Sequence, residues 1–338
     1  MKKLISLICV LAMVLALAAC GSSAPAAATE APAASTEAPA EDVSADKTFV
    51  VGICQLVQHP ALDAATQGFK EALTEALGDK VTFQEQNASG DSATCSLICN
   101  QFVSDEVDLI MANATASIQA AASATNTIPI LGTSITDYGV ALGVDNWTGV
   151  SGTNISGTSD LAPLDGQAAM IQELFPDAKT IGLLYCSGEP NSIFQADSME
   201  ALLTDMGYSV ERYTFADSND VSSVTANACS NSDVLYIPTD NTAASCTEAI
   251  NNVALSAGIP IVAGEEGLAS GCGVATLSIS YYDLGRATGE MAAEILTEGA
   301  DVSTMEVRFA PAFTKEYNAD ICEALNITVP DDYVAIAK

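Results

Sequence analysis

Positive charge is scarce in this sequence. It has 11 lysine and arginine residues against 43 aspartate and glutamate residues, so its formal net charge is −32. Nucleic acids and anionic membrane surfaces would repel a body of this charge. The composition therefore argues against both as partners.

Motifs that mark catalytic, nucleotide and metal sites are also missing. No GxGxxG, GxxxxGK[ST], GxSxG or HExxH pattern occurs. His59 is the only histidine, and Cys95 and Cys99 stand four apart without a CxxC repeat, so buried thiols explain these cysteines better than a zinc site does. The sequence predicts a protein that is not an enzyme and that uses no cofactor and no metal.

Long apolar runs are missing after the first twenty residues. There, two lysines precede the apolar run 4–17, and Leu-Ala-Ala leads into Cys20. This pattern is typical of a secretory signal peptide, and the placement of Cys20 resembles a bacterial lipobox; an incidental cysteine is the alternative. We expect a signal peptide over 1–19, lipidation of Cys20, and a disordered linker rich in Ala, Pro, Thr and Glu over 20–47. The protein would then be extracytoplasmic and lipid-anchored to the cell membrane.

Strand-like and helical runs alternate through the rest of the chain. Residues 49–54 and 107–112 are apolar runs typical of buried strands, and 62–77 carries apolar residues at helical spacing. The alternation stops in the Gly-, Asn-, Ser- and Thr-rich stretch 138–159 and then restarts. The pattern predicts an α/β protein with two doubly wound parallel-sheet lobes, a ligand cleft between them and three interdomain crossings. The predicted N-terminal lobe is 48–155 plus 278–308, and the predicted C-terminal lobe is 156–277 plus 309–338.

Four ordered segments carry a family resemblance. They are QLVQHPALD at 55–63, YCSGEPNS at 185–192, IPTDNT at 237–242 and YYDLG at 281–285. Together they resemble the ABC-transporter substrate-binding lipoproteins related to the tryptophan-binding protein TrpX. The resemblance implies a type I periplasmic-binding-protein fold and a monomer that delivers a small ligand, most often tryptophan or tyrosine, to the permease of an ABC importer.

Candidate ligand-binding residues follow the carboxyl ends of the predicted strands, where open α/β sheets bind ligands. An amino-acid ligand needs a carboxylate for its ammonium group; Asp240 suits this role, Asp137 is second, and helix capping is the alternative for either. His59 is expected to form a hydrogen bond at the cleft edge, the alternative being that it packs beneath Pro60. The full set of predicted ligand-binding residues is Gln58, His59, Asn113, Thr115, Ser117, Ser134, Asp137, Tyr138, Ser187, Glu189, Asn191, Ser192, Asp240 and Asn241.

Aromatic residues make up only 6% of the chain, so few side chains could stack on an aromatic ligand. Tyr138, in a loop, is the foremost candidate, and Tyr185, Phe194 and Tyr282 are others. From the resemblance, we expect a solute-binding protein for an aromatic amino acid. A purine, a sugar or another amino acid is the alternative ligand, and a surface adhesion or interaction lipoprotein is the alternative function.

Overall fold

The computed structural model describes residues 47–337. The predicted signal peptide, Cys20 and all of the predicted linker except Lys47 lie outside these residues. Between residues 47 and 337, no helix is long and apolar enough to cross a membrane.

The first sheet has six strands in the order β11-β5-β4-β3-β1-β2, and every neighbouring pair is parallel. Apolar residues on its central strands are buried against helices on both faces, which is why these strands read as unbroken apolar runs. The strands are β1 Phe49–Gln55, β2 Val81–Asn87, β3 Leu109–Asn113, β4 Ile130–Ile135, β5 Ile155–Ser159 and β11 Arg308–Phe309.

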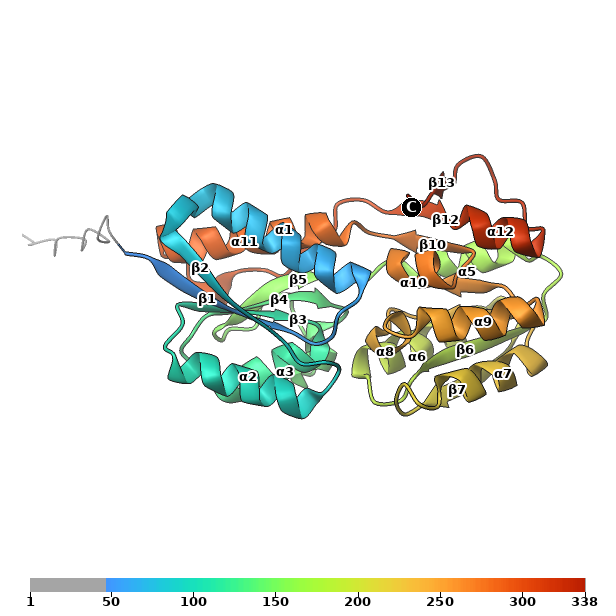
Figure 1. Cartoon of the computed structure of the whole chain (residues 1–338), viewed down its shortest axis with the longest axis horizontal. Coiled ribbons are helices and arrows are strands. Elements are labelled where there is room, and N and C mark those ends of the chain that lie inside the picture. Colours follow the sequence, from blue (N-terminus) through green and yellow to red (C-terminus); the bar gives the residue numbers. More distant parts are fainter. Residues whose placement is uncertain (1–46, 338) are drawn as a thin grey trace, which may run out of the picture. The chain divides into compact units, whose positions relative to one another are not determined.

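Two pairs of helices cover this sheet (Figure 1). Helices α1 (Pro60–Leu77) and α11 (Tyr281–Glu298) share one core with it, and α2 (Ser92–Ser104) and α3 (Thr115–Ala124) share the core of the opposite face. Helix α11 joins this lobe from far along the chain because glycines let it approach α1 closely. A Cβ atom on Gly285 would lie 2.0 Å from the carbonyl oxygen of Ala65.

The second sheet has seven strands in the order β13-β12-β10-β9-β8-β6-β7. All neighbouring pairs are parallel except β10 and β12, which are antiparallel. The strands are β6 Thr180–Cys186, β7 Ser209–Phe215, β8 Val234–Ile237, β9 Ile261–Ala263, β10 Ala275–Ser278, β12 Thr314–Tyr317 and β13 Val334–Ala335.

Helices also cover both faces of the second sheet. One core contains α5, α6 and α12, and the other contains α7, α8, α9 and α10. These helices are α5 Leu164–Leu174, α6 Pro190–Asp205, α7 Val221–Asn231, α8 Asn241–Ala244, α9 Thr247–Ala257, α10 Glu266–Gly271 and α12 Ala319–Leu325. The predicted fold class, two doubly wound lobes with mainly parallel sheets, is confirmed.

The chain passes between the sheets after β5, after β10 and after β11. The first passage differs from the prediction, which ended the N-terminal segment at 155 and so assigned β5 to the second lobe. Strand β5 pairs with β4 in the first sheet. Its sequence, ISGTS, has one large apolar residue and no strand-like alternation, so the pattern did not mark it as a strand. Its pairing with β4 depends on glycine, because a Cβ on Gly157 would lie 2.0 Å from Gly132 O. The expected irregular stretch also contains a short helix, α4 (Tyr138–Leu142).

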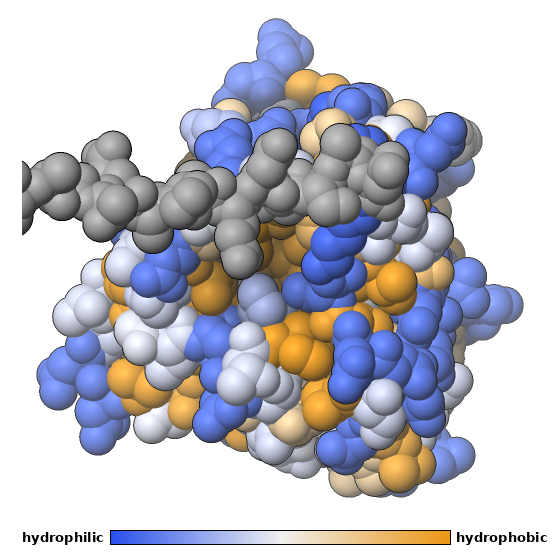
Figure 2. All heavy atoms as spheres, turned by 90° about the vertical axis from the view of Figure 1, so that its left-hand side faces the viewer, coloured by the Kyte–Doolittle hydropathy of each residue, from blue (hydrophilic) through white to orange (hydrophobic). Residues whose placement is uncertain are grey.

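The end of the first lobe that faces left in Figure 1 is a mixed surface. Figure 2 shows hydrophilic and hydrophobic residues interspersed across it. Ion pairs within this lobe include Lys70 with Glu85 and Arg286 with Glu75. Because these side chains are partly exposed to solvent, such pairs contribute little to stability.

Candidate functional site

The loop after β1 meets the loop after β8. His59, the N-cap of α1, is 5% exposed, and its Nε2 lies 3.3 Å from Oδ1 of Asn241, the first residue of α8. One residue follows a strand of the first sheet and the other follows a strand of the second. The carboxyl ends of both sheets therefore contribute to one region, as expected for a ligand site between α/β lobes.

Four buried polar atoms without a partner lie along the carboxyl edge of the first sheet. They are His59 Nδ1, Asn113 Oδ1, Ser134 Oγ and Asp160 Oδ1, and they account for four of the seven such atoms in residues 47–337. Their residues follow or end β1, β3, β4 and β5, which are consecutive in the sheet. A buried polar atom without a hydrogen bond costs about 1–3 kcal/mol, so four in a row indicate a place where a ligand supplies the partners.

Hydrogen bonds fix the side-chain amide of Asn113 so that its Oδ1 has no hydrogen-bond partner. Its Nδ2 donates to Leu62 O at 2.8 Å and to Thr66 Oγ1 at 2.9 Å, and Thr66 in turn donates to Gln55 Oε1 at 2.6 Å. These contacts fix the side chain in one orientation. Asn113 Oδ1 is therefore a preorganised hydrogen-bond acceptor at the end of β3.

Backbone strain lies at the same edge. Ala114 has φ 91° and Ser134 has φ 56°, both in the left-handed region that non-glycine residues avoid. They stand at the ends of the adjacent strands β3 and β4. Ala114 is also the N-cap residue of α3, where Thr115 is buried and no side chain caps the helix. Strain of this kind is concentrated at functional sites.

In the second lobe, Glu189 holds α8 in place. Its Oε1 accepts from the backbone N and the hydroxyl of Thr242, at 2.8 and 2.7 Å. Its Oε2 accepts from Asn191 Nδ2 and from both the backbone N and Nδ2 of Asn241, at 2.8–3.0 Å. Glu189, Asn191 and Asn241 are thus brought together as predicted, but most of their hydrogen-bonding groups serve one another.

Asp240 is a structural carboxylate. It is 1% exposed; Oδ1 accepts from Ala243 N at 2.8 Å, and Oδ2 accepts from Cys186 N at 2.6 Å. Burial, and then the nearby Glu189, raise its pKa to about 8. Asp137 likewise caps α4 through a bond from Val140 N. Both residues thus cap helices, as the alternative to ligand binding expects, and each oxygen of Asp240 already accepts a hydrogen bond from the backbone.

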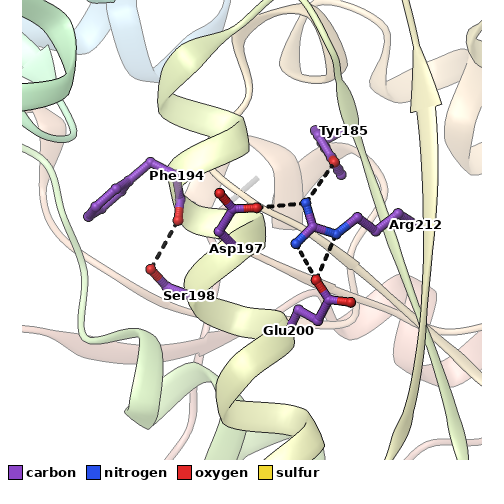
Figure 3. Close-up of polar contacts among 6 residues, drawn as sticks. All are labelled: Tyr185, Phe194, Asp197, Ser198, Glu200 and Arg212. Carbon is purple, nitrogen blue, oxygen red and sulfur yellow. Dashed lines mark hydrogen bonds and ion pairs between the residues drawn. The ribbon is translucent and has the colours of Figure 1, made fainter. Parts of the chain in front are cut away.

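Two of the predicted aromatic candidates, Tyr138 and Tyr185, are engaged elsewhere. Tyr138 is 2% exposed, its ring stacks on Trp147 with centroids 5.7 Å apart, and its hydroxyl lies 3.0 Å from Gly132 O. Tyr185 is buried, and its hydroxyl accepts from Arg212 (Figure 3). Figure 3 shows Phe194 directed away from the Arg212 cluster, which also contains Asp197 and Glu200.

The remaining predicted residues lie in varied surroundings. Buried Ser117 contacts the thiols of Cys54 and Cys95, each at 3.6 Å. Ser187 is exposed and donates to Phe215 O, whereas Ser192 is buried. Gln58 is exposed and lines an open pocket of about 430 Å³ beside α1. Tyr282 donates to Glu71 on α1, within the packing of α1 against α11.

Asp160 was not among the residues that the sequence pattern predicted. This residue directly follows β5 and is 3% exposed; Oδ2 accepts from Tyr281 OH at 2.9 Å, and Oδ1 has no partner. Burial raises its pKa to about 6. Recognition of 155–159 as a strand would have pointed to Asp160, because it is the first residue after that strand's carboxyl end.

Comparison with known proteins places this arrangement in a family. Residues 50–338 match the family model described as ABC transporter substrate binding protein. The chain belongs to this family. It is 38% identical over 280 residues to a tyrosine-binding protein of Clostridioides difficile, which covers 82% of this chain and 81% of the relative. A member of this family binds a solute and catalyses no reaction, in agreement with the prediction.

Two solved structures of relatives differ in their state. One is an ABC domain from Streptococcus pneumoniae in complex with L-Trp, 31% identical, with a TM-score of 0.80 and coverage of 84% of this chain and 97% of that one. The other is a ligand-free, open substrate-binding protein with adhesive properties from Clostridium difficile, 37% identical, with a TM-score of 0.66 and coverage of 86% and 99%. The TM-score of this substrate-binding protein is higher with the complex than with the open structure. A solute-binding protein from Bacillus halodurans with bound myo-inositol, 16% identical with a TM-score of 0.57, shares the fold.

Proposed function

We propose that this protein binds an aromatic amino acid, tyrosine or tryptophan, and delivers it to an ABC importer. The observation that carries the proposal is the row of unpartnered buried groups along the first sheet, which contains a carboxylate oxygen, an amide oxygen, a hydroxyl and an imidazole nitrogen. The relatives that are named for tyrosine or hold L-Trp support this ligand class.

The free groups match an amino-acid zwitterion. A ligand ammonium group donates three hydrogen bonds, and Asp160 Oδ1 is a buried acceptor that carries charge when ionised. A ligand carboxylate needs donors; the Ser134 hydroxyl and the uncapped first turn of α3 supply them. Asp160 therefore takes the ammonium-binding role in this proposal, and Asp240 caps the N-terminus of α8.

Ligand binding would draw the two lobes together. Because His59 and Asn241 make a hydrogen bond only when their lobes are close, a ligand seated at this edge would favour the closed arrangement. The closed form would be the one recognised by the permease, and the protein would act as a monomer.

The experiment is a calorimetric titration of the purified protein with amino acids, nucleosides and sugars. We expect binding of tyrosine or tryptophan and a rise in the midpoint of thermal unfolding. A response to a nucleoside or a sugar, with none to any amino acid, would refute the ligand class.

Membrane attachment is a separate part of the proposal. The lipobox-like sequence supports a diacylated Cys20 that holds the body outside the cytoplasm. Expression in a bacterial host with labelled fatty acid should give a labelled, membrane-bound protein, and Cys20→Ala should give an unlabelled one. Label in the Cys20→Ala variant would refute lipidation at this residue.

Adhesion is a second candidate function, and the adhesive properties named for the 37% identical relative favour it. It would use the outer surface and not the buried edge. Binding to cell-surface or wall material should then be the same for the wild type and for Asp160→Asn. The absence of such binding would remove this candidate and leave solute binding untouched.

A further inference from the structure

The side-chain amide of Asn241 has a single orientation. Its Nδ2, which can only donate, donates to Oε2 of Glu189 at 2.8 Å. Oδ1 of Asn241 therefore faces the other way, where it lies 3.3 Å from His59 Nε2. Since an amide oxygen accepts and never donates, the proton between these residues belongs to Nε2 of His59.

This arrangement settles the state of the other ring nitrogen. Burial lowers the pKa of His59, so its ring is neutral near pH 7 and carries one proton. With that proton on Nε2, the buried Nδ1 presents a lone pair and has no partner in the protein. The site thus contains a fixed acceptor that a ligand must satisfy.

Nδ1 and the proposed ammonium site lie at opposite ends of the row. Asp160 follows β5 and His59 follows β1, with β4 and β3 between them. Three strand spacings separate the two strands, about 14 Å. His59 is therefore expected to meet a different part of the ligand from the part that Asp160 meets. In an aromatic amino acid, that part is the side chain.

We propose that His59 selects ligands whose aromatic side chain carries a hydrogen-bond donor, through a bond from the phenol hydroxyl of tyrosine or the indole N–H of tryptophan to Nδ1. This inference rests on the proposed function, and it names the hydrogen-bond donor of the ligand side chain as the group that is recognised. Phenylalanine offers no such donor and leaves Nδ1 unsatisfied. Asn241 acts as a positioning residue because it determines which nitrogen is protonated.

The experiment compares matched ligand pairs: tyrosine with phenylalanine, and tryptophan with 1-methyltryptophan. For the wild type we expect the donor-bearing member of at least one pair to bind about 10- to 100-fold more tightly, because the other member leaves the buried Nδ1 without a partner. In His59→Leu this preference should disappear. In the control variant Asp160→Asn, both members of the pair should weaken equally and the preference should remain.

Several results would overturn the inference. If His59→Leu kept the preference for the donor-bearing ligand, or weakened both members of a pair equally, Nδ1 would not bind the ligand side chain. Binding of all four ligands by the wild type without preference would overturn this inference and leave the proposed function standing. Binding of no aromatic amino acid would overturn both.

A measurement on the wild type keeps the test independent of any variant's folding. Because His59 is the only histidine, its two nitrogens can be observed by 15N NMR without assignment, provided that no histidine tag is present. We expect a neutral ring protonated at Nε2, and a shift of the Nδ1 resonance when tyrosine or tryptophan binds. A ring protonated at Nδ1, or no shift on binding, would contradict the proposal.

Discussion

Nε2 of His59 lies 3.3 Å from Oδ1 of Asn241, and this hydrogen bond joins residues 182 positions apart that follow strands of different sheets. It makes a specific contribution to closure of the lobes, because it cannot form when they separate. Four consequences of the structure can be tested.

Removal of the Asn241 side chain should weaken ligand binding. In Asn241→Ala the closed form loses the bond to His59, and a bond of this kind contributes about 0.5–1.5 kcal/mol, which is roughly a two- to tenfold loss of affinity. Titration calorimetry gives the affinity, and small-angle scattering of the ligand-free protein should show a larger radius of gyration. The exposed Asn252→Ala is the matched control. Equal affinities in the two variants would contradict this role.

Asp160 and Asp240 should respond differently to the same change. Asp160→Asn removes a charged acceptor at the ligand site, which should weaken amino-acid binding by about 1.5–3 kcal/mol, roughly 10- to 100-fold. The analogue 3-(4-hydroxyphenyl)propionate, which lacks the ammonium group, should lose less affinity. Asp240→Asn should mainly lower the unfolding midpoint, because the carboxylate accepts from Ala243 N and Cys186 N. If Asp240→Asn abolished binding in a protein of normal stability, the roles would be reversed.

Buried carboxyl groups should make the protein more stable at mildly acid pH. Burial raises the pKa of Glu265 from 4.5 to about 7 and that of Asp160 from 3.8 to about 6. A raised pKa means that the folded state binds the proton more tightly, so stability is greatest below the unfolded pKa and falls as pH rises through the folded pKa. The unfolding midpoint should therefore be higher at pH 5 than at pH 8. Glu265→Gln should reduce this difference; a midpoint that rises toward pH 8 would contradict the prediction.

Close contact between α1 and α11 should not tolerate a side chain at residue 285. In Gly285→Ala the new Cβ would meet Ala65 O at 2.0 Å, and forced displacement in a packed core costs about 1–3 kcal/mol. Chemical denaturation should show this loss as a lower midpoint. Gly188→Ala is the control, because the nearest atom to its Cβ would be Cys186 Sγ at 3.7 Å. Similar midpoints for both variants would show that the helices adjust without cost.

The sequence alone determined most of the elements and the fold class. Apolar runs such as 49–54 predict buried parallel strands, and the rule that ligands bind at the carboxyl ends of such strands led to His59, Asn113 and Ser134. Strand β5 was missed because Ile155–Ser159 depends on close glycine contacts with β4 and has no apolar pattern of its own.

Tertiary structure decided which polar groups are free for a ligand. Asp240 and Asp160 both follow a strand. Asp240 Oδ2 accepts a hydrogen bond from the backbone N of Cys186, 54 residues away, whereas Asp160 Oδ1 has no partner. The proton position on His59 likewise depends on Glu189 acting through Asn241. Hydrogen bonding is short-ranged and directional, so whether a group has a partner depends on segments that only folding brings together.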